Sequence, residues 1–519
     1  MLYACLIAVF ASLVLRSTGL RPPLAGPGGE GGFIGYGTLL WLIPTLHAVL
    51  AAVVHLTARR TLSAIERTNS LRPTETLDAV VASARVAAAM LTAAGVCLLG
   101  YLDAVRWVVG DVILIDEGLT ALPFLLLVVA GWWSTYPIEK LLRDSTFIRD
   151  LDDGRPIYPP PTRAGFVWGH VRHQLLILLL PMAMMAVLWG SVEGVVHKAH
   201  DRFRAAVLSG LEPDGVLERL GAWMHAHPTQ WPLVYYAIKL CAMAVIIASA
   251  PLVIRRVWDT TPLREGSIAE GLLRMCRQQG VKVRDLLVWR TGGTMINGAV
   301  LGVLGRARYI LLTDGLLDVL PNHAVQAVMA HEIGHVRCRH VPWLTATLLA
   351  ASGTALFAAD AALRLALGTD LDHLPETAQL AVCAAAFGGA VAAFGYVSRR
   401  FEWQADAFAA KHFSVHTPPT DDPEAPWTPS PTVTRPAVAS MCAALEIVAE
   451  ANNLPRSRFT FRHGSIATRV ARLRALEGQP LNALRVDAVS RWLKRAVLAG
   501  CVLVVATAVY SIATAVPGR

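Results

Sequence analysis

The chain of 519 residues contains 54% hydrophobic and only 16% charged residues, with a formal net charge of +9. This balance lies well outside that of a soluble globular protein and indicates a protein that crosses the membrane several times. The basic residues are spread over loops beside apolar segments, without aromatic interleaving or a known binding motif, so the net charge predicts no nucleic-acid partner.

Nine apolar segments are candidates to cross the bilayer, whose hydrocarbon core takes about twenty residues of helix. In chain order they are 3–15, 33–56, 79–102, 118–133, 175–196, 231–254, 343–367, 379–397 and 496–516. The first lacks the basic start of a signal peptide, and we interpret it as an anchor. Lys239 lies inside the sixth segment. An ionisable group is costly within a membrane span, so its presence there indicates a functional role. We expect Lys239 either to line a water-filled chamber or to pair with an acid.

The basic residues predict the orientation of these segments. The loop 255–342 carries twelve Lys and Arg residues, whereas the loop 368–378 carries none and has three acids. The longer loop is therefore expected in the cytoplasm, which places the N-terminus inside and the C-terminus outside.

Between the sixth segment and residue 342 the pattern changes to that of a soluble fold. Helical spacing predicts a helix at 268–279, and β-rich runs separated by glycine predict strands at 285–290, 294–301 and 308–313. A small mixed sheet results. Its edge strand either pairs with an extended substrate backbone or serves only as structure, and the sequence does not separate these readings.

A second helix is predicted from Pro321-Asn322 to His340, and it carries the sequence His331-Glu332-Ile333-Gly334-His335. Residues four apart share a helix face, so both histidines can reach one metal ion, while Glu332 can address a water bound to it. A catalytic zinc site also needs a third protein ligand and an open fourth position.

The third ligand is expected in the segment 398–406, where an apolar run continues as a polar helix. We assign Glu402 as the ligand and Asp406, one turn later, as the carboxylate that orients a ligand imidazole through its other ring nitrogen. The alternative is that both acids pair with Arg399 and Arg400 on a solvated helix face.

The predicted organisation divides the protease into two cytoplasmic parts. A membrane region spans 1–254, the first protease part 255–342, two membrane helices 343–398, the second part 399–495, and a last membrane helix 496–519. The second part includes a Pro-rich insertion at 416–436, which we interpret as disordered or lid-like, and helices at 438–451 and 465–476.

Two motifs carry a resemblance to a known family: His-Glu-Ile-Gly-His-Val at 331–336 and Ser-Arg-x-x-Glu-x-x-Ala-Asp at 398–406, with two apolar spans between them. Over roughly 255–476 the chain resembles the integral-membrane zinc metalloproteases that include the bacterial protease HtpX and the CAAX prenyl endopeptidases. The resemblance implies a gluzincin-like HExxH site in which Glu332 is the general base, zinc is bound by two histidines and Glu402, and the site faces the cytoplasm.

Two shorter matches extend the resemblance. Asn297-Gly298-Ala299 resembles the start of the family's substrate-binding edge strand, although alanine is commoner where Gly298 stands. His463 and Arg469 resemble the family's late histidine and the arginine six residues later, with glycine replacing the usual proline after the histidine. We take His463 as a candidate oxyanion donor and Arg469 as a candidate substrate contact.

The sequence therefore predicts an α-helical, multi-pass membrane protein of a bacterial inner membrane, with a mainly α cytoplasmic protease domain that carries a small mixed sheet. We expect one zinc ion per chain, the lipid bilayer as its setting, and protein or peptide substrates, foremost unfolded membrane proteins in quality control. Two alternatives stay open: a sensor protease that cleaves one cytoplasmic repressor, and a CAAX-type processing protease. The largest outer loop, 197–230, leaves little room for a sensor domain.

Overall fold

The computed structural model describes residues 34–152, 161–416 and 429–514, except 211, 213, 229, 294, 303, 304 and 453, together with residues 2, 5, 6, 8, 9, 12, 13 and 24. In this part of the chain, eight helices are long and apolar enough to cross a membrane: Tyr36–Thr68, Arg72–Leu99, Ile115–Asp144, Arg163–Leu208, Ala237–Val257, His340–Leu367, Ala381–Val415 and Arg485–Tyr510. They overlap the last eight predicted segments and confirm an integral membrane protein. About half of the predicted segment 3–15 and most of the Pro-rich insertion lie outside the described residues.

The chain forms two compact units. Unit 1 comprises Met1–Ile246 with Pro375–Thr377, and unit 2 comprises Ile247–Leu374 with Ala378–Arg519. The helices of unit 1 are α2 (Tyr36–Thr68), α3 (Arg72–Ala94), η1 (Gly95–Leu99), α4 (Tyr101–Val109), α5 (Ile115–Asp152), α6 (Arg163–His170), η2 (Val171–Leu175), α7 (Leu176–Leu208), α8 (Val216–Ala226) and most of α9 (Gln230–Val257).

Lys239, on α9, has an acid partner in unit 1. Its Nζ lies 2.7 Å from Glu193 Oε1 on α7, and the Tyr235 hydroxyl donates to the same oxygen at 3.2 Å. Pairing is the expected solution for a charge within a span. Of the two expectations for Lys239, the structure shows the acid partner.

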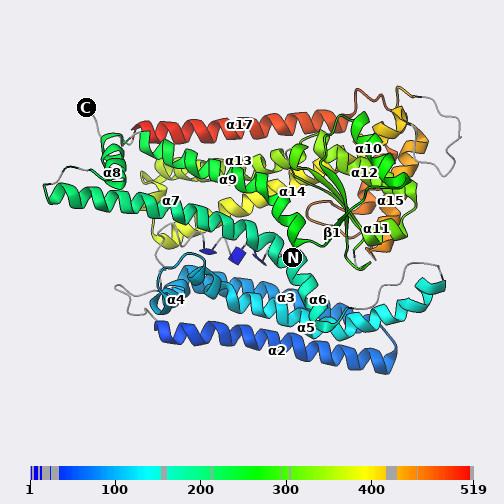
Figure 1. Cartoon of the computed structure of the whole chain (residues 1–519), viewed down its shortest axis with the longest axis horizontal. Coiled ribbons are helices and arrows are strands. Elements are labelled where there is room, and N and C mark those ends of the chain that lie inside the picture. The colour runs from blue at the N-terminus through cyan, green and yellow to red at the C-terminus, as the bar shows by residue number, and fades with distance from the viewer. Residues whose placement is uncertain are drawn as a thin grey trace. The chain divides into compact units, whose positions relative to one another are not determined.

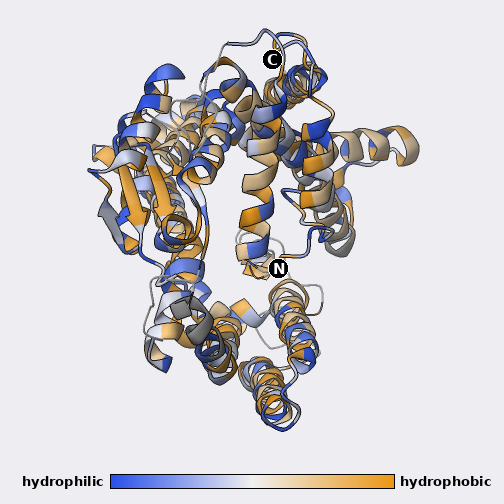
Figure 2. Ribbon diagram, turned by 90° about the vertical axis from the view of Figure 1, so that its right-hand side faces the viewer, coloured by the Kyte–Doolittle hydropathy of each residue, from blue (hydrophilic) through white to orange (hydrophobic). Residues whose placement is uncertain are grey.

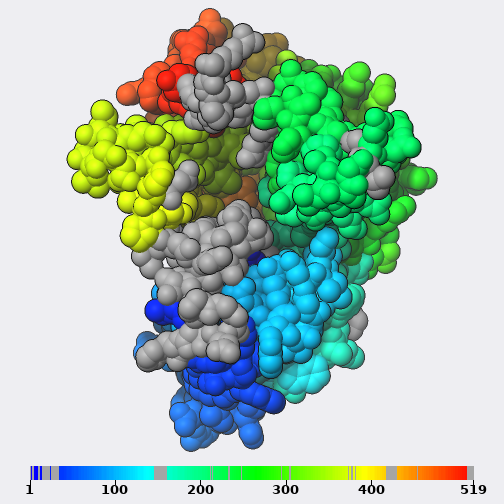
Figure 3. Space-filling model, turned by 90° about the vertical axis from the view of Figure 1, so that its left-hand side faces the viewer, coloured from blue at the N-terminus to red at the C-terminus, as the bar shows by residue number. Residues whose placement is uncertain are grey.

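After α9, the described part of unit 2 contains the sheet, eight α-helices and two 3-10 turns. They are β1 (Thr260–Pro262), α10 (Ser267–Gln278), β2 (Asp285–Trp289), β3 (Gly298–Leu301), η3 (Gly305–Ala307), β4 (Tyr309–Thr313), α11 (Asp314–Val319), α12 (Asn322–Arg337), α13 (His340–Leu367), η4 (Leu371–His373), α14 (Glu376–Val415), α15 (Arg435–Ala451), α16 (Ile466–Arg474) and α17 (Arg485–Thr514). Figure 1 shows the sheet, α10, α12 and α15 gathered at one end of the long helices α13, α14 and α17. The connection between α13 and α14 lies at the opposite end, on the face seen in Figure 3.

The sheet is mixed, as predicted, with the strand order β1-β2-β4-β3. β2 and β4 are parallel, whereas β1 and β3 join antiparallel at the two edges. All five residues of the central strand β4 are buried, and two of them, Ile310 and Leu312, pack with helices α10 and α12 in one hydrophobic core. The hydrophobic strands stand out in Figure 2. β3 is shorter than the predicted strand 294–301, and the three-residue β1 was not predicted.

The helix that carries both histidines ends earlier than predicted. α12 stops at Arg337, and Arg339 then adopts a left-handed conformation with φ of 55°. This turn redirects the chain, so His340 starts the membrane helix α13 instead of ending α12. His340 is thereby folded back toward the helix it was expected to terminate.

Three membrane helices of unit 2 meet at one level near the sheet domain. Leu344 of α13, Val397 and Phe401 of α14, and Leu493 of α17 form a single buried cluster. The apolar run of α14 ends at Val397, after which Ser398 and two arginines follow. The cluster therefore marks the membrane boundary of unit 2.

Candidate active site

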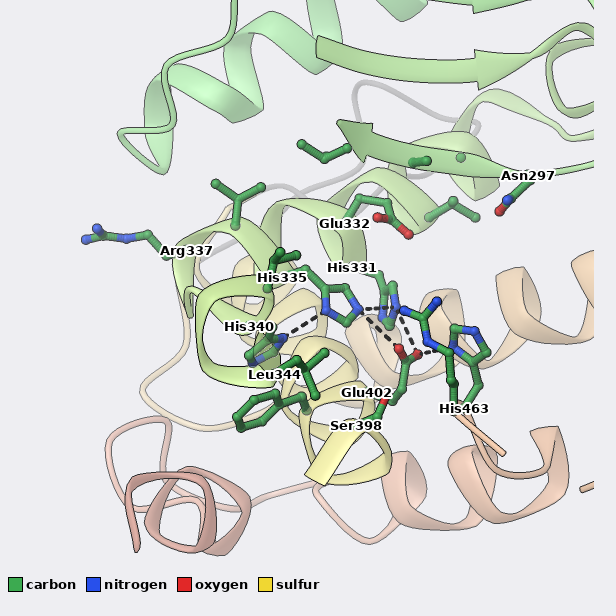
Figure 4. A pocket seen from close by; sticks show the side chains of 18 of the residues that line it. Asn297, His331, Glu332, His335, Arg337, His340, Leu344, Ser398, Glu402 and His463 are labelled. Carbon is green, nitrogen blue, oxygen red and sulfur yellow. Dashed lines mark hydrogen bonds and ion pairs between the residues drawn. The ribbon is translucent and has the colours of Figure 1, made fainter. Parts of the chain in front are cut away.

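Three side chains from two helices face a common point. His331 and His335 lie one turn apart on α12, and Glu402 projects from α14. The two Nε2 atoms are 3.1 Å apart, and each lies 3.5 Å from an oxygen of Glu402. These donor atoms form the one metal-type cluster found among the described residues, all within 4.8 Å of one another. Their convergence is visible in Figure 4.

The spacing of these atoms fits zinc. A tetrahedral ion with bonds of about 2.0–2.1 Å separates its ligand atoms by roughly 3.3 Å, close to the three observed distances. Glu402 is 2% exposed and its Oε2 accepts no hydrogen bond in the structure. A buried carboxylate oxygen without a hydrogen bond is costly unless it binds a cation. Two imidazoles and one carboxylate are also a donor set that catalytic zinc sites use.

Asp406 supports the first histidine from behind. Its Oδ1 lies 2.9 Å from His331 Nδ1, the nitrogen turned away from the cluster. Arg469 of α16 donates to both oxygens of Asp406, from Nε at 2.8 Å and from Nη2 at 2.6 Å, and its Nη1 lies 3.6 Å from Glu402. The Arg469 side chain is only 7% exposed. Arg469 therefore lies behind the three side chains of the cluster, where its bidentate contact holds the Asp406 carboxylate in place.

The surroundings shift the pKa values of the site residues in different directions. Burial, and the nearby charge of Glu402, raise the pKa of Glu332 to about 7, which suits a group that accepts and returns a proton at neutral pH. Burial acts to lower the pKa of His331, but the carboxylates of Asp406 and Glu402 raise it to about 9. Burial and the charge of His331 hold the pKa of His335 well below its usual value.

A chain of side-chain hydrogen bonds leads from His335 into the protein. His335 Nδ1 lies 2.9 Å from His340 Nδ1, and His340 Nε2 lies 3.0 Å from Gln404 Oε1. Gln404 Nε2 then donates to Asp487 Oδ1 at 2.8 Å, and Asp487 also binds Lys411. His340 is fully buried and stacks on Phe401, with ring centroids 4.4 Å apart.

The acceptor at Gln404 fixes the direction of this chain. An amide oxygen only accepts, so His340 Nε2 must carry the proton and His340 Nδ1 must accept one from His335. His335 then has its proton on Nδ1 and its lone pair on Nε2, the atom in the metal cluster. This is the tautomer in which an imidazole binds a metal through Nε2.

The edge strand β3 borders a cavity of about 900 Å³ in front of the cluster. Asn297, Gly298 and Ala299 line it, together with Glu332, and Figure 4 shows Glu332 between the histidines and this strand. A Cβ on Gly298 would lie 3.1 Å from Val328 Cγ1, so glycine lets β3 approach α12 closely.

The hydrogen bonds of β3 alternate between its two sides. Thr313 N donates to Asn297 O at 3.0 Å, so Asn297 and, two residues later, Ala299 turn their backbone groups toward β4. The backbone groups of Gly298 and Val300 therefore point to the free edge.

His463 lies at the mouth of the same cavity. Its side chain is 50% exposed, and Nδ1 lies 3.0 Å from Glu402 Oε2 without the geometry of a hydrogen bond. All sequence-predicted site residues thus gather within unit 2. Asn297 and His463 reach the open side, whereas Asp406 and Arg469 lie behind the ligands.

The sequence reasoning missed His340, Gln404 and Asp487. Gln404 stands inside the second motif and His340 follows the first by five residues, so their polarity beside two motifs was an available signal. The hydrogen bonds that join these three residues depend on the turn at Arg339 and on the packing of α17. No local sequence pattern reveals either feature.

Two histidines and a glutamate around one point, with a second glutamate beside them and adjoining membrane helices, form the arrangement expected of an integral-membrane metallopeptidase. Residues 262–477 match the model of peptidase family M48. The resemblance predicted from the two motifs is thereby confirmed.

The sequence matches to individual relatives cover shorter stretches of the chain. The chain is 31% identical over 122 residues to a "Protease HtpX homolog" of Aeropyrum pernix, covering 22% of this chain and 37% of that protein. It is 39% identical over 49 residues, 9% of this chain and 14% of the relative, to the plastoglobule-localized metallopeptidase 48 of Arabidopsis thaliana. The chain thus spans little more than a third of the first relative's length. The crystal structure of S. mikatae Ste24p aligns with 84% of this chain and 98% of its own, at 13% identity and a TM-score of 0.39.

Proposed function

We propose that this protein is a zinc-dependent endopeptidase of the membrane, with Glu332 as its general base. The observation that carries the proposal is the spacing of 3.1 to 3.5 Å among the donor atoms of His331, His335 and Glu402, beside a glutamate whose pKa is raised to about 7. The match of residues 262–477 to the model of peptidase family M48 supports this proposal.

One zinc ion per chain is held by His331, His335 and Glu402. Asp406 orients His331 through Nδ1, and Arg469 holds Asp406 in place while its charge offsets the buried carboxylates. We assign Arg469 this supporting role in preference to substrate contact, because its guanidinium is buried against Asp406.

Zinc, when bound, polarises the scissile carbonyl and acidifies the attacking water. Glu332 takes the proton from that water and passes it to the leaving amine, as its pKa near neutrality allows. His463 donates a hydrogen bond to the developing oxyanion from the exposed side of the cavity. Asn297 and the free edge of β3 hold the substrate extended above the ligands.

An extended backbone selects unfolded segments, since helices offer no free edge to pair with. The relative from Aeropyrum pernix is named a protease HtpX homologue. We therefore propose turnover of damaged membrane proteins in a bacterial inner membrane as the role, with the site on the cytoplasmic side that the basic loop 255–342 favours.

The test is cleavage of a labelled unfolded protein by the purified chain in detergent, with zinc quantified in each preparation. Glu332→Gln should keep the zinc content of the wild type and lose cleavage, because the amide cannot accept the proton. His331→Ala should lose both. Substantial cleavage by Glu332→Gln would remove the general-base role, and full zinc in Glu402→Ala would remove the third ligand.

A further inference from the structure

Three arginines and three aromatic side chains form a cluster where α14 leaves its apolar run. This arginine–aromatic patch consists of Arg399, Arg400, Arg472, Tyr396, Trp403 and Phe459. Arg472 and Arg400 lie over the Trp403 ring, with Cζ 3.4 and 4.2 Å from its centroid. Arg400 also lies 4.7 Å from the Tyr396 ring, and Arg399 lies 5.3 Å from the Phe459 ring.

The patch carries positive charge without a matching acid. Within the described parts of the chain, no carboxylate lies in ion-pair contact with Arg399, Arg400 or Arg472, in contrast to the buried Arg469. Burial and the charge of Arg400 lower the pKa of Arg472. Like charges this close repel one another unless an anion lies between them.

The position of the patch indicates the medium that it faces. The apolar run of α14 ends at Val397, at the level where α13 and α17 also reach the boundary cluster. Phe459 is 65% exposed and Phe461 is 46% exposed. The Phe461 ring lies against Gly395, where a Cβ would come within 2.5 Å of it, so the loop reaches down along the membrane helix. Exposed aromatic rings and arginines at the end of a span are typical of the bilayer interface.

We infer that the arginine–aromatic patch binds the phosphate headgroup of an anionic phospholipid, with Phe459 and Phe461 beside its acyl chains. Guanidinium groups bind phosphate oxygens through paired N–H donors, and the rings hold the guanidinium planes in place. Basic pockets beside membrane helices on the cytoplasmic side bind such headgroups.

Lipid bound here would also order the loop that carries His463. Arg399 Nη1 donates to the carbonyl oxygen of Phe461 at 2.8 Å, two residues before His463. The loop is closed by reciprocal backbone hydrogen bonds between Thr460 and Gly464. A headgroup that fixes Arg399 therefore fixes the approach of His463 to Glu402. This consequence rests on the proposed function, whereas lipid binding does not.

The test is native mass spectrometry of the full-length protein, released from detergent after incubation with equal amounts of phosphatidylglycerol and phosphatidylcholine. We expect the wild type to retain phosphatidylglycerol preferentially. The combined variant Arg399→Gln, Arg400→Gln, Arg472→Gln should bind it at least about tenfold more weakly, because each arginine near a headgroup contributes on the order of a fivefold factor. The control variant Arg274→Gln, Arg277→Gln, Arg284→Gln removes the same charge from exposed positions and should retain the lipid.

Equal retention of both lipids by the wild type, or unchanged binding in the patch variant, would overturn the inference. Displacement of the lipid by inorganic phosphate at matched concentration would also overturn it, since a free-anion site would explain the charges. If the triple variant fails to fold, Arg472→Gln alone should weaken binding measurably. The mass-spectrometric measurement needs no protease turnover, so the lipid-binding inference can hold even if the proposed protease activity is not found. Faster cleavage in phosphatidylglycerol bilayers than in phosphatidylcholine bilayers would support the further link to His463.

Discussion

Replacing His340 by phenylalanine tests whether the hydrogen-bond chain behind the metal site holds His335 in its binding form. A phenyl ring can keep the stacking on Phe401 while removing both ring nitrogens. Two buried groups then lose their partners: the Nδ1–H of His335 and the Oε1 of Gln404.

The size of the change in zinc affinity depends on whether each lost hydrogen bond matters in the zinc-free state, in the zinc-bound state, or in both. A buried polar group without a partner costs about 1–3 kcal/mol. The Gln404 oxygen is unpaired with or without zinc, so its cost lowers the free energy of unfolding and cancels in zinc affinity. His335 can shift its proton to Nε2 when zinc is absent but must keep it on Nδ1 when zinc is bound. Zinc affinity should therefore fall, by about 10- to 100-fold, which corresponds to about 1.4–2.7 kcal/mol.

The assay is competition for zinc between the purified protein and a chromophoric chelator in detergent. Lys494→Met is the matched control, because Lys494 also contacts this region, at the Cys338 carbonyl, but does not touch His335. It should leave zinc affinity unchanged. A folded His340→Phe protein that binds zinc within twofold of the wild type would refute the reasoning.

Three further outcomes are expected. Arg469→Met removes the guanidinium that pairs with the buried Asp406 carboxylate and leaves it only the contact with His331. The free energy of unfolding, measured by thermal unfolding in detergent, should fall by about 3–5 kcal/mol, and a loss below about 1 kcal/mol would contradict this prediction. Without metal, carboxylates raise the pKa of His331 to about 9 against the effect of burial, so zinc must displace a proton at neutral pH. Zinc affinity should then rise about tenfold per pH unit from about pH 6 to 8, and a flat chelator titration would argue against this. Val300→Pro removes an N–H at the free edge of β3 and should raise KM about three- to tenfold with unchanged zinc content. Ala299→Pro, by contrast, removes an N–H that faces β4 and should disrupt the sheet. Equal KM values for Val300→Pro and the wild type would exclude substrate pairing at this edge.

Features with a local signature could be predicted from the sequence. The two histidines of α12 follow from helical spacing, and the mixed sheet follows from β-rich runs separated by glycine. Glu402 and Asp406 could be singled out because a helix places residues four apart on one face. Their approach to α12 was an expectation from chemistry, since a zinc site needs a third ligand.

Features that depend on an unusual turn or on distant packing could not be predicted. Arg339 adopts a left-handed conformation with neither glycine nor asparagine to signal it, so His340 was assigned to the end of the preceding helix. Arg469 resembled a substrate contact, and only tertiary packing places it against Asp406. β1 is three residues long and contains Pro262, which a strand tolerates only at an edge.

The order of the metal ligands along the chain has a consequence for biogenesis. His331 and His335 emerge before α13, and Glu402 emerges only after α13 and most of α14 have been synthesised. A nascent chain that has not yet threaded this helical hairpin into the bilayer cannot bring its glutamate to its histidines. We therefore expect zinc loading at the proposed ligands to follow insertion of α13 and α14, so the newly made chain lacks a complete zinc site until this hairpin is in the membrane.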